Sequence, residues 1–243
     1  MSDGFSNKPK ILRGAFVEYG LSIPPLFVVF QFNPLQLTRN RSLTYGVPGE
    51  RQRAETAEGQ TQASVASQVS LRRFHQEYDD LTDLRDAQVV TVQEEAIGFE
   101  IRLDATDKLN DGDAITCQFG IAPQLATLEL MVHPKEESLL GQALSSLLGS
   151  SSNAFSFTKS ANPPLVLFIW GRKRVLPVNI NSLNITETEF STDLNPIRAT
   201  AAVSLTVIEG PNLPFTYSKA MKEVMSVLNL ANIGSITDVV IPG

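Results

Sequence analysis

The side chains that most often do chemistry in proteins are few in this chain and stand apart from one another. The two histidines, His75 and His133, belong to no His-x-x-x-His or Cys-x-x-Cys arrangement, so no zinc site is indicated. Cys117 is the single cysteine and has no base beside it in the sequence, although a nucleophilic thiol needs one. The chain also has no Gly-x-Ser-x-Gly elbow and no glycine-rich phosphate loop. The sequence therefore predicts no catalytic residue, no cofactor and no enzymatic activity.

One acidic segment has the outline of a calcium-binding loop. Asp107, Asp111 and Gly112 have suitable types and spacing. An EF-hand loop also needs an oxygen ligand at its third position and a bidentate Glu at its twelfth. Leu109 and Gln118 occupy those positions, so we interpret the segment as an ordinary acidic turn and predict no metal site.

Basic side chains supply the candidate interface residues. Arg172, Lys173 and Arg174 form a short cluster where the pattern predicts a hairpin tip, and they could contact an acidic neighbour or simply be a solvated turn. Arg198 follows Pro196 at the beginning of a predicted strand. A guanidinium held there could fork onto a carboxylate across a subunit interface; a plain arginine at a strand edge is the other interpretation.

Composition limits the classes of partner and compartment. The 26 acidic and 20 basic residues leave a net charge of −6, which disfavours non-specific binding to nucleic acid. One cysteine allows no intrachain disulfide. The first residues show no signal-peptide pattern, and the longest apolar runs, 26–30 and 165–170, are far shorter than a membrane span. We expect synthesis and assembly in the cytoplasm, without direct insertion into a membrane.

Strand patterns dominate the chain. The clearest group is a meander of three strands over 165–170, 175–190 and 198–207, the last alternating apolar and polar residues. Further strands are predicted over 10–19, 26–32, 35–45, 89–92 and 97–103, and Phe30, Phe99, Phe168 and Val203 are predicted core residues. The fold class expected is mainly β (α+β), an antiparallel barrel with one or two short helices that plug or flank it.

The remaining segments are helical or polar. Residues 121–133 and 139–148 are predicted helices, 104–113 is a polar turn, and a short apolar stripe from Met221 to Leu228 predicts a packing helix. Residues 46–88 are rich in polar residues and form either a mobile surface excursion or an arm that orders against a neighbouring subunit. The predicted domain is 10–209, with this excursion inside it, followed by a C-terminal tail over 210–243.

The order of three segments resembles a known family, the baseplate tube-adaptor and tube proteins of contractile injection systems, which are phage-tail-like machines. The first is the apolar strand from Pro24 to Pro34, which ends in Phe-Asn-Pro. The second is 99–106, a strand that leads into an acidic loop, and the third is the meander with Trp170-Gly171 and Pro196-Ile197-Arg198-Ala199. Together they span roughly residues 15–210. Family members often continue into a small LysM-type domain, for which residues 210–243 are too short and have the wrong pattern.

The resemblance implies a structural role. It implies a tube-protein-like barrel in an adaptor ring, a hexamer of this chain, that joins the spike to the inner tube and templates assembly of the tube. The implied partners are further copies of the chain, the inner tube protein, the spike protein and other baseplate proteins, within a phage-tail-like particle. The alternatives are an inner tube protein, a small-molecule-binding β-barrel, or an enzyme whose site is assembled from loop residues.

Overall fold

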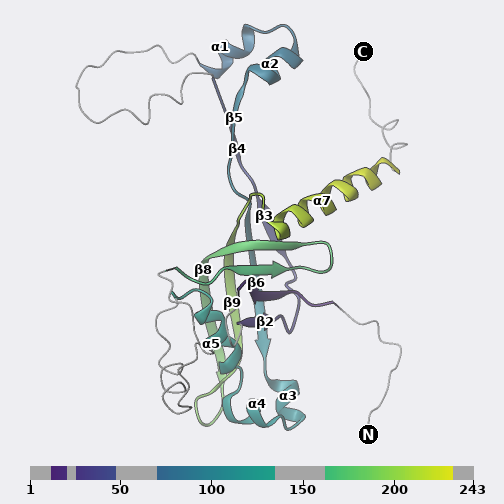
Figure 1. Ribbon diagram of the computed structural model, residues 1–243. Helices are drawn as coiled ribbons and strands as arrows, with labels where there is room; N and C mark the ends of the chain where they lie inside the picture. The colour runs from purple at the N-terminus through teal and green to yellow at the C-terminus, as the bar shows by residue number, and fades with distance from the viewer. Residues whose placement is uncertain (1–11, 21–25, 48–69, 135–161, 232–243) are drawn as a thin grey trace, which may run out of the picture. The chain divides into compact units, whose positions relative to one another are not determined.

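The structure is a computed structural model that describes residues 12–20, 26–47, 70–134 and 162–231 (Figure 1). The chain divides into two compact units. The sheet unit comprises residues 1–39 and 96–243, and the ribbon unit comprises residues 40–95. Each is described separately below.

Seven antiparallel strands form the sheet unit, in the order β2-β1-β7-β8-β9-β6-β3. Their bounds are β1 Ala15–Glu18, β2 Phe27–Val29, β3 Leu37–Asn40, β6 Ala96–Asp104, β7 Val166–Ile169, β8 Val175–Phe190 and β9 Pro196–Val207. β8 and β9 are by far the longest. β9 alternates buried and half-buried side chains from Ala199 onward, so the predicted period of two is confirmed.

The predicted closed barrel is wrong, because the sheet is open. Among the described strands, β2 and β3 lie at opposite ends of the strand order and do not pair with each other. With only three and four residues, respectively, they offer short ladders for closing a barrel. The Gln31 side-chain amide, which follows β2, instead donates to the Asp104 carbonyl (2.7 Å) and accepts from the Asp104 N–H (2.9 Å). One side chain thus joins the end of β2 to the end of β6 without a continuous ladder.

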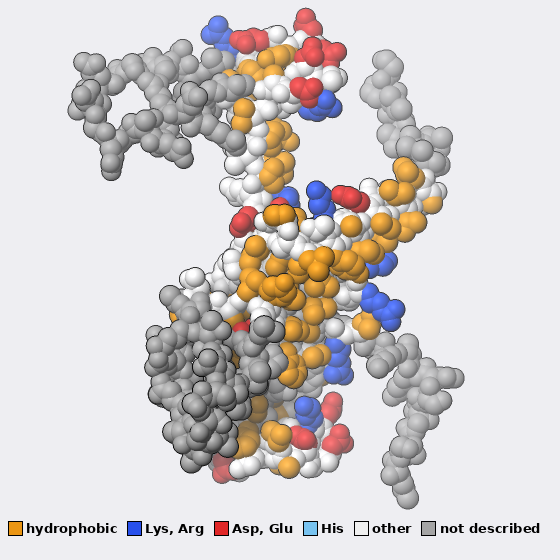
Figure 2. Space-filling model, viewed as in Figure 1, with side chains coloured by type: hydrophobic (Ala, Val, Ile, Leu, Met, Phe, Trp, Pro, Cys, Tyr) orange, Lys and Arg blue, Asp and Glu red, His pale blue; other side chains and the backbone are white. Residues whose placement is uncertain are grey.

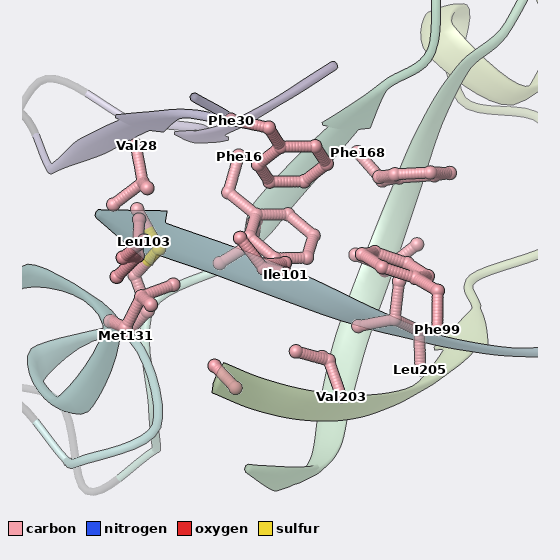
Figure 3. Close-up of a cluster of buried hydrophobic side chains, with 14 of the residues drawn as sticks. Phe16, Val28, Phe30, Phe99, Ile101, Leu103, Met131, Phe168, Val203 and Leu205 are labelled. Atoms are coloured by element: carbon pink, nitrogen blue, oxygen red, sulfur yellow. The ribbon is translucent and has the colours of Figure 1, made fainter. Parts of the chain in front are cut away.

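An aromatic cluster fills the concave side of this sheet (Figure 3). Phe16, Phe30, Phe99 and Phe168 are all buried, and their ring centroids lie 5.1–6.4 Å apart. Phe16 on β1 contacts Phe99 on β6, although three strands separate β1 from β6 in the sheet order. The sheet must therefore curl strongly around its core. The predicted burial of Phe30, Phe99, Phe168 and Val203 is confirmed.

Four described helices belong to the sheet unit: α3 Thr106–Asn110, α4 Ala114–Phe119, α5 Ala122–Leu130 and α7 Leu213–Leu228. The predicted helix over 121–133 is confirmed as α5, with Leu125 and Leu128 buried. α3 and α4 lie within and just after the segment predicted as a polar turn. Asp113 caps α4 by accepting from the Thr116 N–H, a short local signal that the sequence patterns did not capture.

Gly120 makes the corner between α4 and α5 possible. Its φ is +58°, and a Cβ there would lie 2.1 Å from the Pro196 carbonyl oxygen. That carbonyl accepts from the Ile121 N–H at 2.8 Å. The beginning of β9 at Pro196 is therefore held against the helices by a backbone contact that only glycine permits.

The ribbon unit consists of a two-stranded antiparallel ribbon and two short helices. The ribbon pairs β4 Leu43–Gly46 with β5 Val89–Val92, and the helices are α1 Leu71–Gln76 and α2 Leu81–Ala87. The single strand predicted over 35–45 is thus two strands, β3 and β4, in different sheets. Both helices lie in the segment predicted as a polar excursion, and residues 48–69 of it lie outside the described residues.

Two further predictions can be placed. The helix predicted over 139–148 lies outside the described residues. The C-terminal stripe from Met221 to Leu228 is the second half of the longer helix α7, which begins at the Asn212 cap. None of the helices in the described parts of the chain is both long and apolar enough to cross a bilayer.

Candidate assembly surfaces

Arg198 lies in a polar cluster at one end of the sheet. Its Nε donates to the Asp104 carboxylate at 2.8 Å, and its Nη1 donates to the Glu189 carboxylate. Thr106 Oγ1 lies 3.4 Å from Nη2. Asp104 is the register partner of Arg198 on β6, so strand pairing brings these two residues together across a large sequence separation. The Arg198 guanidinium therefore forks onto two carboxylates of its own chain.

Local hydrogen bonds tune the charge of this cluster. The Thr106 hydroxyl, which donates to Asp104 at 2.5 Å, is the main cause that lowers the pKa of the Asp104 carboxyl, with the Thr106 N–H and Arg198 assisting. Asp104 thus stays ionised beside Arg198 well into the acid range. Since the Arg198 side chain remains 44% exposed, solvent weakens each ion pair.

The basic cluster lies at the tip of the β7–β8 hairpin, as predicted, and contacts α7. The Tyr217 hydroxyl donates to the Arg172 carbonyl at 2.8 Å, and Lys173 Nζ lies 3.3 Å from the Met225 sulfur. Ser218 is buried, and its hydroxyl oxygen accepts from the Val175 N–H (2.9 Å) and donates to the Val175 carbonyl (2.6 Å). The hairpin tip and α7 therefore form one connected feature, with the basic side chains of Arg172 and Lys173 exposed.

The convex face of the sheet has two chemically different halves. Over β2, β1 and β7 the outward side chains are apolar: Phe27 and Val29, Ala15 and Val17, and Leu167 and Ile169. Phe27 and Val29 are 61% and 50% exposed. Figure 2 shows hydrophobic side chains gathered over the middle of the sheet unit and running out along α7. Phe27 and Val29 are therefore exposed at the β2 edge of this half, whereas the other four side chains are half-buried.

Small or polar side chains cover the other half of the convex face. Its rows combine Ser182, Asn184 and Thr186 of β8 with Ser204, Ala202 and Thr200 of β9 and with Gly98, Glu100 and Arg102 of β6. A broad open groove of about 1410 Å³ runs along its β6–β9 part and reaches Asn33 and Thr38. Its lining mixes apolar side chains, such as Phe32 and Leu35, with charged ones, such as Glu100 and Arg102.

The residues with potentially reactive side chains do not come together in one site. His75 bonds to Gln88, and the Nδ1 atom of His133 lies 2.8 Å from the Glu129 carbonyl oxygen at the end of α5. Cys117 is exposed on α4. No group of three or more His, Cys, Asp or Glu residues could hold a metal ion within the described ranges.

Sequence reasoning missed two parts of these surfaces. Arg198 meets its two partners, Asp104 and Glu189, because of the register of the strands, and the sequence does not state that register. The exposure of Phe27 and Val29 was missed because the predicted strand over 26–32 is apolar almost throughout, so its pattern does not separate an exposed face from a buried one. The alternation of exposed and buried residues in β2 leaves little signal in so apolar a run.

A scan against protein-family models gave no match, and a search of the curated proteins gave none at the significance required.

Proposed function

We propose that this chain is a structural subunit that assembles with further copies into a ring, the adaptor layer between the spike and the inner tube of a contractile injection machine. The proposal rests on the sequence resemblance together with one structural observation. That observation is the open seven-stranded sheet with two short, unclosed end strands among the described residues, β2 and β3.

Open sheet edges favour assembly. An edge strand exposes N–H and C=O groups that can pair with another chain. β2 and β3 differ in sequence and lie at opposite ends of the strand order, so β2 of one copy could pair with β3 of the next. Such a head-to-tail contact repeats, and it closes into a ring when the rotation between copies permits. A ring would cover the β2 and β3 edges of every copy.

The two halves of the convex face support the same role. An apolar surface such as that of Phe27 and Val29 suits contact with another protein layer. The small and polar half suits a wall that faces water. In this proposal the ring is a hexamer, its other partners are the spike, inner tube and remaining baseplate proteins, and it is assembled in the cytoplasm. The role involves no catalysis, no cofactor, no nucleic acid and no insertion into a membrane.

The edge contact can be tested on β3 with two neighbouring proline substitutions, Thr38→Pro and Arg39→Pro. Consecutive N–H groups of an edge strand point alternately toward the sheet and away from it, so one proline removes a bond to β6 and the other an outward donor. We expect native mass spectrometry to show a closed oligomer for the parent chain. One variant should keep the parental melting temperature and lose the oligomer, whereas the other should lose stability. A monomeric parent, or two folded variants with the parental oligomer, would contradict the proposal.

An inner tube subunit is the second candidate, since the same open edges would serve it. The two roles differ in stacking, because a tube subunit adds layer upon layer and an adaptor stops after one. Electron microscopy of the purified protein separates them: long tubes indicate the tube subunit, and single rings the adaptor.

A further inference from the structure

The ribbon unit has one apolar face that its own described residues leave open. Leu43 pairs with Val92 and Tyr45 with Val90, so all four side chains lie on the same face. Leu43 is 46% exposed, Val92 and Tyr45 are each 51% exposed, and Val90 is 37% exposed. The opposite face carries Thr44 and Thr91. An isolated two-stranded ribbon is marginal in water, so this face needs a covering surface.

The sheet unit has a second apolar surface of a different shape. In the C-terminal helix α7, the side chains of Leu213, Tyr217, Val224 and Leu228 are 81%, 44%, 48% and 61% exposed. Their spacing places them along one side of the helix. We call this row the α7 ridge. Ser218 is the only fully buried residue of α7. This helix therefore contacts the sheet along a narrow line beside the ridge.

The ribbon face and the α7 ridge match in form and size. A helix laid on a sheet face is one of the few stable ways to cover apolar side chains. Four strand residues extend about 13 Å, and the eleven-residue step from Tyr217 to Leu228 extends roughly 16 Å along a helix. One ridge can therefore cover the whole ribbon face.

Charge favours the same contact. The stretch from Glu77 to Gln88, beside the ribbon, contains five acidic residues and one basic residue, Arg85. The acidic residues are Glu77, Asp79, Asp80, Asp83 and Asp86. Near the ridge, the hairpin tip that contacts α7 carries the exposed basic side chains of Arg172 and Lys173. Opposite charges at the rim of an apolar contact steer the two surfaces together.

We propose that the ribbon face of one copy packs on the α7 ridge of a second copy of this chain. The proposal rests on the assembly of copies proposed above and names a contact between them. A second copy fits because every chain carries one ribbon face and one α7 ridge. The contact therefore repeats head to tail, and in a closed ring it leaves no copy with either surface exposed.

Cysteine cross-linking in the full chain tests this contact. Cys117 is first replaced by Ser, because it is exposed and would react. Two differently tagged chains, one with Val90→Cys and one with Val224→Cys, are co-expressed and treated with a short bismaleimide. The matched control replaces Val90→Cys with Thr91→Cys, on the opposite ribbon face. We expect a covalent dimer carrying both tags, at about tenfold higher yield than the control. The tested contact uses the ribbon face of the first chain and the α7 ridge of the second. Adding Val224→Asp to the first chain, which carries Val90→Cys, should therefore leave the yield of the dimer unchanged. When the second chain instead carries Val224→Asp with Leu228→Cys as its cross-linking site, the yield should fall by about tenfold, because a charge would enter an apolar contact.

The outcomes separate this contact from the ring itself. Closed oligomers by native mass spectrometry without the tagged dimer overturn the ribbon contact and leave the ring proposal standing. Monomers alone overturn both. In the double variant Val90→Cys, Val224→Cys, a product cross-linked within one chain and no dimer would show that the ribbon covers its own α7, which also overturns the proposal.

Discussion

The two compact units differ in how much they bury. The sheet unit encloses a continuous core that includes four phenylalanines, three of them with no exposed surface at all. Among the described residues of the ribbon unit, Phe74 is the one buried apolar side chain, in contact with the ring of Tyr78 at 5.1 Å. Since apolar burial drives folding, the sheet unit is expected to be stable alone and the ribbon unit to depend on a partner.

The largest expected effect lies in the sheet unit. Phe168→Ala removes a fully buried ring that contacts Phe16, Phe99 and Trp170. It should lower the free energy of unfolding by about 3–5 kcal/mol in a denaturant titration. Phe27→Ala is the control, since its side chain is 61% exposed, and should change it by less than about 1 kcal/mol. Equal losses in both variants would contradict the assignment of the core.

The matching change in the ribbon unit is Phe74→Ala. It removes that unit's one described buried ring and should cost the unit about 3 kcal/mol. Because so little else holds the unit, the amides of 70–95 in the assembled protein should lose their protection from hydrogen exchange while those of β8 and β9 keep theirs. In the parent, 70–88 should exchange rapidly in the free chain and slowly after assembly. Loss of protection across both units would show that they unfold together.

A smaller effect is expected at the Arg198 cluster. Arg198→Glu would place a third carboxylate beside Asp104 and Glu189 and should cost about 1–2 kcal/mol, because the exposed pairs are each worth under about 1 kcal/mol. Added salt should reduce the loss, and Arg198→Gln should cost less. A thermal melt beside native mass spectrometry separates the two roles of Arg198. A normal melt with a lost oligomer would place its main contact in a neighbouring copy.

The smallest expected effect is a pH dependence. The pKa of Asp104 in the folded chain is lowered from its ordinary value of 3.8, chiefly by the Thr106 hydroxyl. Its contribution to stability is therefore complete above that value and is lost as the pH falls through the lowered folded pKa. Asp104→Asn should make stability less dependent on pH below about 4, measured by denaturant titrations across the acid range. An unchanged acid dependence would mean that other carboxyls dominate.

Sequence patterns predicted the regular parts of this fold well. β5 and β8 lie where alternation and composition placed them, and β6, β9 and α5 differ by a few residues at their ends. Those elements have long or clear periodicity. The failures lie where local signals are short: α3 and α4 were missed, and the strand predicted over 35–45 proved to be two. The basic hairpin tip was predicted as a turn, but its contact with α7 was not.

The sequence by itself determined the burial period of the long strands, the scarcity of catalytic side chains and the amphipathic pattern of the C-terminal helix. Those properties depend on neighbours in the chain, so they can be read locally. Only the tertiary structure decided that the sheet stays open and that Arg198 meets Asp104 and Glu189. It also decided which apolar side chains remain exposed. Register, sheet closure and exposure depend on residues far apart in sequence, whose meeting is set by the summed packing of the whole core.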